Sequence, residues 1–164
     1  MASVDVHDAR RLQAIGREIR TEQERHVRAP LEVVWDLQTD VAQWTRWHPD
    51  VSHSVPLGPH RPGAMFEWVW RGVPTRTRVL DVVPCQRLTW SSLSARGTSV
   101  AHWLFDPDDE GVLVTALVRL APDGAVPGSR ADYLQERALS RWLDGLARAA
   151  DVRSMETLVL RSDA

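Results

Sequence analysis

Hydrophobic and polar residues alternate along the middle of the chain, from Val51 to the segment that precedes the last helical pattern. Alternate side chains of a strand point to opposite faces of a sheet, so this pattern predicts half-buried β-strands. Clusters of Gly, Pro, Asp and Arg interrupt the alternation repeatedly, as turns do. The segment therefore predicts six strands that are joined as consecutive hairpins.

Other patterns precede and follow these strands. We expect a charged first strand over residues 17–28, a helix that begins at Pro30 and a second short helix that ends before Pro49. Residues 129–151 have apolar side chains at helical spacing and predict one long amphipathic helix. This order is typical of an α+β protein with one antiparallel sheet and its helices on one side.

The length of 164 residues fits one domain, 1–164. We take residues 17–150 as its core and residues 1–16 as an N-terminal extension that contains a short helix over residues 5–15. Residues 151–164 form a C-terminal tail whose pattern does not favour one type of element.

One face of the predicted sheet combines aromatic with very small side chains. We expect Ser92, Ala101 and Ala116 to lie side by side on three neighbouring strands, with tryptophans around them. A solid core places large residues where neighbours are small, whereas aromatic walls around an empty middle are typical of a ligand cavity. The alternative, in which the long helix fills the space, stays open. The inward positions are Phe66, Trp68, Trp70, Thr75, Thr77, Val79, Val83, Leu88, Trp90, Ser92, Ala101, Trp103, Phe105, Val112, Val114, Ala116 and Val118.

The predicted turns also set the strand pairing. The first hairpin places Trp70 opposite Thr75, and the next turn places Asp81 opposite Trp90. Asp81 is then the ionisable side chain that faces inward on these strands, where it would suit a general acid or base. The alternative is a bulge beside Asp81 that turns the carboxylate to solvent.

Four further residues are candidates for ligand contact or chemistry. His53 shares a strand face with Val51, so an inward imidazole could act as a base, whereas an edge-strand histidine is more often structural. Arg25 could reach a ligand carboxylate or enolate. His48 should lie near the cavity entrance, where packing is the alternative role, and Tyr133 could offer a hydroxyl over the mouth.

Composition excludes several classes of function. The net charge of −2 gives no case for nucleic acid, and no apolar run reaches the ~20 residues that membrane insertion requires. The N-terminus lacks an apolar signal core, so we expect a cytoplasmic protein. All 20 basic residues are Arg, which excludes lysine chemistry. One cysteine, Cys85, excludes an internal disulfide, and the histidines lack metal-ligand spacing, so we expect no metal and no cofactor.

Several stretches resemble the START-like, or SRPBCC, superfamily and in particular its polyketide cyclase/dehydrase-like group. They are VRAPLEVVWDLQTDVAQWTRWHPDV, PGAMFEWVWRG, DVVPCQRLTWSS and AHWLFDPDDEG, within residues 20–150. The resemblance implies a helix-grip fold, in which a curved seven-stranded antiparallel sheet wraps the long C-terminal helix around a deep hydrophobic cavity. Members include aromatase/cyclases of polyketide assembly, lipid carriers and hormone receptors, so the fold alone does not identify the activity.

The leading hypothesis is a protein that binds a hydrophobic, polyketide-derived small molecule and promotes its cyclisation or dehydration, with His53 and Asp81 as catalytic candidates. The alternative is a non-enzymatic binder or carrier with the same cavity. A third interpretation makes the tail side chains a dimer contact, so both a monomer and a homodimer stay open. The candidate ligand-binding residues are Arg25, His48, Trp68, Trp70, Thr75, Thr77, Trp90, Ser92, Ala101, Trp103, Ala116, Tyr133 and Trp142.

Overall fold

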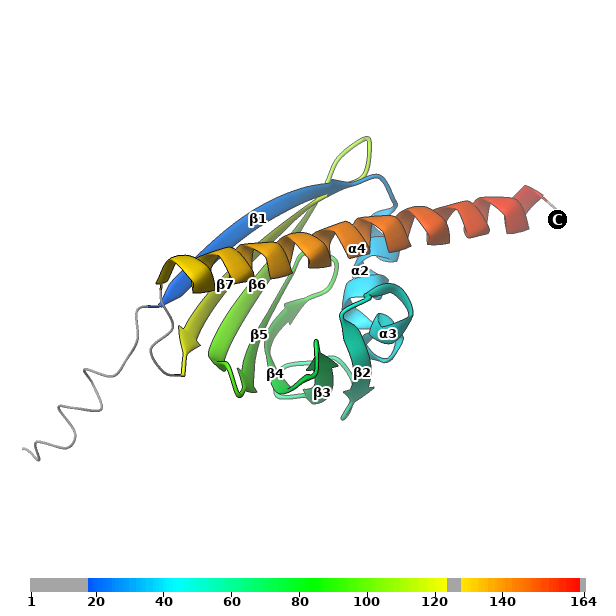
Figure 1. Ribbon diagram of the computed structural model, residues 1–164. Helices are drawn as coiled ribbons and strands as arrows, with labels where there is room; N and C mark the ends of the chain where they lie inside the picture. The colour runs from blue at the N-terminus through cyan, green and yellow to red at the C-terminus, as the bar shows by residue number, and fades with distance from the viewer. Residues whose placement is uncertain (1–17, 124–127, 163–164) are drawn as a thin grey trace, which may run out of the picture.

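The described part of the chain consists of a seven-stranded sheet, two short helices with a 3₁₀ turn between them, and one long helix (Figure 1). The computed structural model describes residues 18–123 and 128–162, so the helix expected over residues 5–15 lies outside the described residues. The order of elements is the predicted one. The elements are β1 (Ile19–Val27), α2 (Leu31–Thr39), the 3₁₀ turn η1 (Val41–Gln43), α3 (Trp44–Trp47), β2 (Val51–Pro56), β3 (Met65–Trp70), β4 (Val73–Val83), β5 (Arg87–Ser94), β6 (Gly97–Pro107), β7 (Val112–Pro122) and α4 (Gly128–Ser162).

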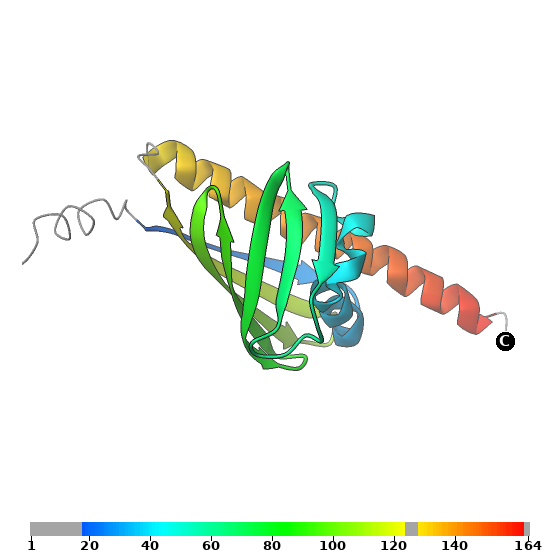
Figure 2. The same cartoon turned by 90° about the horizontal axis from the view of Figure 1, so that it is seen from below.

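The sheet is antiparallel throughout and has the strand order β1-β7-β6-β5-β4-β3-β2. Strands β2 to β7 are consecutive hairpins, and β1 pairs with the last strand, β7. The sheet curves around α4, which runs across its inner face (Figures 1 and 2). Helix α2 packs against α4, and α3 packs against β2. This is the predicted α+β helix-grip architecture.

The β3–β4 hairpin has a two-residue turn, Arg71–Gly72. Both residues have positive φ, 48° and 77°, as in the primed turns that match the twist of antiparallel strands. Trp70 therefore pairs with Val73, whereas the predicted partner was Thr75. The β5–β6 and β6–β7 hairpins also differ from prediction by two residues. Because the side-chain period is two, such a shift leaves every side chain on its predicted face.

A β-bulge reverses the orientation of Asp81. The register shifts between Val79 and Asp81, so that Asp81 pairs with Thr89 and not with the predicted Trp90. Its carboxylate lies on the outer face, where it accepts a hydrogen bond of 2.8 Å from Arg87 Nε and is about half exposed. The interpretation that Asp81 faces the cavity is therefore wrong, and its alternative, a bulge that turns the carboxylate to solvent, is what the structure has.

His53 is displaced by the same kind of irregularity. The register of β2 shifts between Val51 and His53, and Ser54 then takes the position opposite Trp68. The His53 side chain is exposed. The prediction that His53 points inward with Val51 is therefore wrong as well.

The hydrophobic core fills the part of the interior that lies beneath α2 and α3. Trp44 of α3 is fully buried and makes edge-to-face contacts with Phe66, Trp68 and Trp142, at ring-centroid distances of 5.2, 5.5 and 4.9 Å. Such aromatic contacts stabilise a core by about 0.5–1.5 kcal/mol beyond the burial of their area. Part of the aromatic face is therefore solid core.

Helix α4 is longer than predicted. It continues to Ser162, so most of the expected tail is helical, and Figure 1 shows its C-terminal end projecting beyond the sheet. The side chains expected to form a dimer contact are exposed there: Met155, Leu158, Val159 and Leu160. That dimer contact stays a prediction. No helix in the described ranges is long and apolar enough to cross a membrane.

The close approach of β6 to β7 gives a test of the fold. A Cβ on Gly97, whose φ is +125°, would lie 2.1 Å from the Ala121 carbonyl oxygen, whereas a Cβ on Gly72 would meet nothing within 4 Å. We predict that Gly97→Ala lowers the free energy of unfolding by about 3 kcal/mol or more and that the control, Gly72→Ala, costs about 1 kcal/mol. Urea unfolding followed by tryptophan fluorescence measures both. Equal losses would contradict this packing.

Candidate functional site

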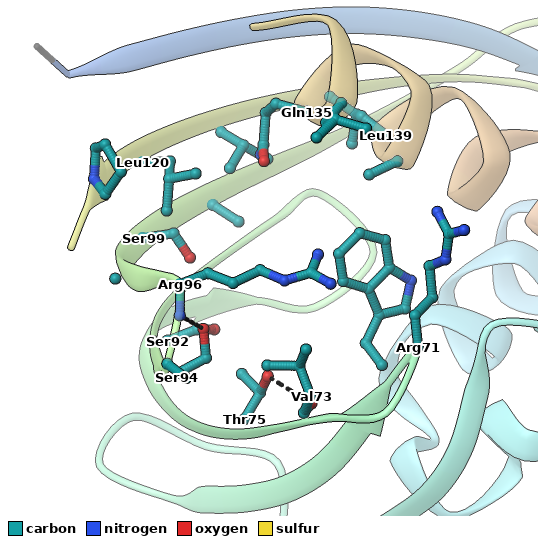
Figure 3. Close-up of a pocket in the computed structure, with 18 of the residues that line it drawn as sticks. Arg71, Val73, Thr75, Ser92, Ser94, Arg96, Ser99, Leu120, Gln135 and Leu139 are labelled. Atoms are coloured by element: carbon teal, nitrogen blue, oxygen red, sulfur yellow. Dashed lines mark hydrogen bonds between the residues drawn. The ribbon is translucent and has the colours of Figure 1, made fainter. Parts of the chain in front are cut away.

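A cavity of about 720 Å³ lies between the inner face of the sheet and the first half of α4 (Figure 3). Side chains of β3 to β7 form its walls, and residues 131–142 of α4 cover it. Helix α4 therefore leaves this space open. From the sequence alone, it was undecided whether the long helix would fill it. The apolar part of the lining includes Trp68, Trp70, Trp90, Ala101, Trp103, Val118, Leu120, Leu139 and Trp142.

Aromatic rings surround the inner part of the cavity. Trp90, Trp103 and Trp142 are buried, with ring centroids 5.8 Å apart for Trp90 and Trp103 and 6.2 Å apart for Trp103 and Trp142. Ala101 lies between Trp90 and Val118 in the strand pairing. Its methyl group leaves space among large neighbours, which keeps this part of the cavity open.

Hydroxyl side chains form a second band across the sheet, nearer the hairpin turns. Thr77, Ser92 and Ser99 pair across β4, β5 and β6, and Thr75 and Ser94 pair beside them. This band replaces the predicted row of Ser92, Ala101 and Ala116, because the pairing of β5 with β6 and of β6 with β7 is shifted by two residues from the predicted one. The wall is therefore polar on one side and aromatic on the other.

Thr77 supports the wall and does not line it. It is fully buried, accepts a hydrogen bond from Trp68 Nε1 at 3.0 Å, and shares another of 2.7 Å with the Ser92 hydroxyl. These contacts fix the Trp68 ring and orient the Ser92 hydroxyl, which lines the cavity.

Gln38 of α2 fixes two further indole rings. It is fully buried; its side-chain Oε1 accepts a hydrogen bond of 2.9 Å from Trp142 Nε1, and its backbone oxygen accepts one of 3.2 Å from Trp44 Nε1. Buried donors need partners because an unpaired one costs about 1–3 kcal/mol. Trp103 differs from these rings, since its buried indole N–H has no hydrogen-bond partner among the described residues.

Charged side chains are confined to the mouth of the cavity. Arg71 and Arg96, from the β3–β4 and β5–β6 turns, line it together with Asp123, which follows β7. The Arg96 guanidinium lies 4.8 Å from the centroid of the Trp70 ring, a cation–π contact. Figure 3 shows the Arg96 side chain extending across the opening. The deeper lining, as far as the structure describes it, has no titratable side chain.

The structure brings many of the predicted ligand-binding residues together and leaves others outside the cavity. Thr77 and Ala116 are fully buried within the sheet but do not form part of the lining. The predicted residues that do line the cavity are Trp68, Trp70, Thr75, Trp90, Ser92, Ala101, Trp103 and Trp142.

Arg25 and Tyr133 point elsewhere. The Arg25 guanidinium forms an ion pair with Asp144, so it joins β1 to α4 at the surface. Tyr133 is 54% exposed and accepts a hydrogen bond of 3.0 Å from Arg137 on the next turn of α4. Neither side chain is part of the cavity lining, which contradicts the expected ligand contacts.

His48 lies in the core behind Trp142 and not at the cavity entrance. It is 1% exposed, its ring centroid is 4.4 Å from that of Trp142, and its Nδ1 accepts a hydrogen bond of 3.1 Å from the Asp50 N–H. Burial lowers the pKa of His48 from 6.5 to about 4, although Asp50 opposes the shift. His48 is therefore a neutral core residue, and the packing alternative is the better description.

The sequence prediction missed Arg71, Ser94, Arg96, Ser99 and Gln135. Ser94 and Ser99 lie on the same strand face as Ser92, so the alternation contained the signal for both. Arg71 and Arg96 belong to turns, where strand alternation gives no direction for a side chain. Within residues 18–123 and 128–162, no cluster of His, Cys, Asp and Glu could hold a metal ion.

Comparisons with known proteins agree with this architecture. Residues 18–151 match the profile of a family described as polyketide cyclase/dehydrase and lipid transport. No curated protein matches the chain significantly. A START superfamily protein from Mycobacterium smegmatis superposes with a TM-score of 0.71 at 14% identity, covering 83% of this chain and 98% of that one.

Two solved aromatase/cyclase structures are also similar. The Zhui aromatase/cyclase from Streptomyces sp. R1128 has a TM-score of 0.72 at 16% identity, covering 84% of this chain and 96% of that one. The di-domain ARO/CYC StfQ from the steffimycin biosynthetic pathway has a TM-score of 0.69 at 17% identity, covering 93% of this chain and 56% of that one. At these identities the likeness shows the START-like fold.

The burial of His48 predicts a pH dependence of stability. Because the pKa of His48 falls from 6.5 to about 4 on folding, the unfolded chain binds more protons between these values. Stability should therefore fall as the pH is lowered through this window, by up to about 3 kcal/mol from this residue. Urea unfolding at about pH 7 and about pH 4.5 measures the loss.

The matched variant is His48→Gln, which lacks the titrating group. Burial also lowers the pKa of His60, so the wild type and the variant share that contribution. The difference between their pH dependences isolates His48. The same loss of stability in both proteins would show that His48 does not titrate in this way.

Proposed function

The chain belongs to the polyketide cyclase/dehydrase and lipid transport family, and from this premise we propose that its cavity binds a hydrophobic, oxygen-bearing small molecule of polyketide type. The observation that carries the proposal is the cavity itself, about 720 Å³ with five tryptophans in its lining. Ligand pockets commonly have volumes of about 300–1,000 Å³ and apolar walls with a few polar groups.

The polar groups of the wall favour a ligand that carries oxygen atoms. Ser92, Ser94, Ser99 and Thr75 present hydroxyls, which can both donate and accept hydrogen bonds. The unpaired indole N–H of Trp103 would gain an acceptor from a ligand carbonyl that reached it. An aromatic or polyketone chain would offer both the flat apolar surface and the oxygens that such a wall binds.

Any chemistry in this cavity would depend on holding the ligand in a reactive conformation. The deeper lining in the described ranges has no titratable side chain, and Asp81 and His53 lie on the outer side of the sheet. A rigid cavity can still promote cyclisation, since effective molarities of ~10⁵ M or more are reached in well-oriented intramolecular reactions. The family and the two aromatase/cyclase neighbours favour this candidate.

The second candidate is a carrier that binds the same kind of molecule without changing it. The absence of an acid–base pair from the described inner lining favours this candidate, and the family description includes lipid transport. The two candidates differ in what becomes of the bound molecule. Liquid chromatography with mass spectrometry of a linear polyketone distinguishes them: a dehydrated product, or an isomer of equal mass with a new retention time, identifies the enzyme if it does not form in the same time without the protein.

We predict that filling the cavity weakens binding. Ala101→Trp would place an indole in the space between Trp90 and Val118, and Ser99→Phe would fill the hydroxyl side. Titration with the neutral fluorescent probe N-phenyl-1-naphthylamine should show affinity at least about tenfold weaker for each variant, a loss of about 1.4 kcal/mol. Thermal unfolding establishes that each variant is folded.

Three variants outside the cavity are the controls. Ala42→Trp adds the same side chain at an exposed position, while Asp81→Ala and His53→Ala remove the discarded catalytic candidates. Each should bind the probe within about twofold of the wild type, as surface substitutions usually have small effects. Undiminished binding by the two filled variants would exclude the cavity as the binding site.

A further inference from the structure

The mouth of the cavity bears charged side chains, whereas the walls bear apolar and hydroxyl side chains. We propose that Arg71 and Arg96 recognise an anionic group, a carboxylate or a phosphate, on the outer end of the hydrophobic ligand. The inference rests on the proposed binding function of the cavity and adds the class of ligand: an amphiphilic anion and not a neutral molecule.

The two arginines reach one opening from separate hairpins. Arg71 is in the β3–β4 turn, Arg96 is in the β5–β6 turn, and both turns lie at the same end of the sheet because Thr75 pairs with Ser94. Figure 3 shows the two side chains on different sides of the opening. Each guanidinium can donate hydrogen bonds to an anion at this opening, and guanidinium matches the geometry of carboxylate and phosphate oxygens.

The local charge balance at the mouth is positive. Neither guanidinium lies within ion-pair distance of a carboxylate in the described ranges. Asp123 is the one acidic residue of the described lining. Asp50, whose backbone oxygen accepts a hydrogen bond from the Arg71 N–H, has its carboxylate bound by Arg141 at 2.7 and 2.8 Å. An arriving anion would therefore meet two arginines that have no carboxylate at ion-pair distance, although the charge of Arg71 contributes to the lowered pKa of Asp50.

Arg71 occupies a backbone position that its residue type does not favour. Its φ of 48° lies in the left-handed region, where the first residue of such a turn is usually Asn, Asp or Gly. A non-glycine residue there costs of order 1 kcal/mol. Backbone strain of this kind is common at functional sites, and here the strained residue bears a cation on the rim of the cavity.

The Arg96 side chain extends across the opening of the cavity. Its guanidinium stacks over the Trp70 ring at 4.8 Å, a contact that holds a cation without neutralising it. A bound carboxylate would replace this contact with charge-assisted hydrogen bonds, which are the stronger interaction. The hydroxyls of Ser94 and Ser99, beside the mouth, would bind further oxygens of the ligand.

The experiment compares three ligands that share a naphthalene ring and differ in the outer group: 1-naphthylacetate, 1-naphthyl phosphate and the neutral 2-(1-naphthyl)ethanol. Each displaces N-phenyl-1-naphthylamine from the wild type, from Arg96→Gln and from Arg71→Asn. We expect the wild type to bind at least one anion about tenfold more tightly than the alcohol, since a charged hydrogen bond commonly changes affinity by that factor or more. The anion that binds more tightly identifies the outer group as a carboxylate or a phosphate.

Arg96→Gln and Arg71→Asn should each reduce the preference for the anion to about threefold or less and leave the affinity for the alcohol within about twofold. Arg71→Asn should also be more stable than the wild type, because Asn suits the turn.

Arg78→Gln is the matched control. It removes a charge from the outer face and should keep the wild-type preference for the anion. About 0.5 M NaCl should weaken anion binding by the wild type more than by Arg96→Gln.

Equal affinity of the wild type for the anions and the alcohol would overturn the proposal, and so would an anion preference that survives in both arginine variants. The proposed binding function fails in a different way, when Ala101→Trp binds the neutral probe as well as the wild type does. Loss of the anion preference with neutral binding retained is the outcome that the proposal requires.

Discussion

The hydrogen bond of 2.9 Å from the Trp142 indole to Gln38 Oε1 fixes the boundary between core and cavity. Trp142 projects from the middle of α4, and its ring contacts Trp44 of the packed core on one side and lines the open space on the other. Gln38 accepts a hydrogen bond from each indole, through its side-chain Oε1 and its backbone oxygen, while its side-chain Nε2 has no partner among the described residues. With this ring held, the first half of α4 can cover the sheet without collapsing onto it, and a site with aromatic walls results.

Much of the fold can be predicted from the sequence because one physical rule, the period of two along a strand, is repeated over six strands. The pairing of three hairpins differs by two residues from the predicted one, as the Arg71–Gly72 turn shows, but an error of two residues does not change the face to which a side chain points. The bulges beside Asp81 and His53 are different, because a single extra residue inverts the alternation and no residue type marks it in advance. The catalytic roles expected for Asp81 and His53 required the alternation to continue without a bulge at these two positions.

The candidate site also has a part that can be predicted from the sequence and a part that cannot. The tryptophans of its strands, Ser92 and Ala101 were predictable because strand alternation sets their direction, whereas the mouth depends on side chains of turns. Arg25 was placed on the correct face of β1, yet α4 passes close enough for Asp144 to bind its guanidinium. A long flexible side chain is positioned by its partners in the folded protein and not by its place in the sequence. The walls could therefore be predicted, and the charged mouth could not.

The central claim, that this cavity binds an aromatic small molecule, is tested most directly by the indole N–H signals of the eight tryptophans. A ¹H–¹⁵N spectrum can follow these signals while N-phenyl-1-naphthylamine is added to the protein. The signals of Trp70, Trp90 and Trp103, which line the cavity, should shift with a common dissociation constant, while that of Trp35, which does not line it, should stay in place. A shift confined to Trp35, or none at the lining residues, would show that the probe does not bind in this cavity.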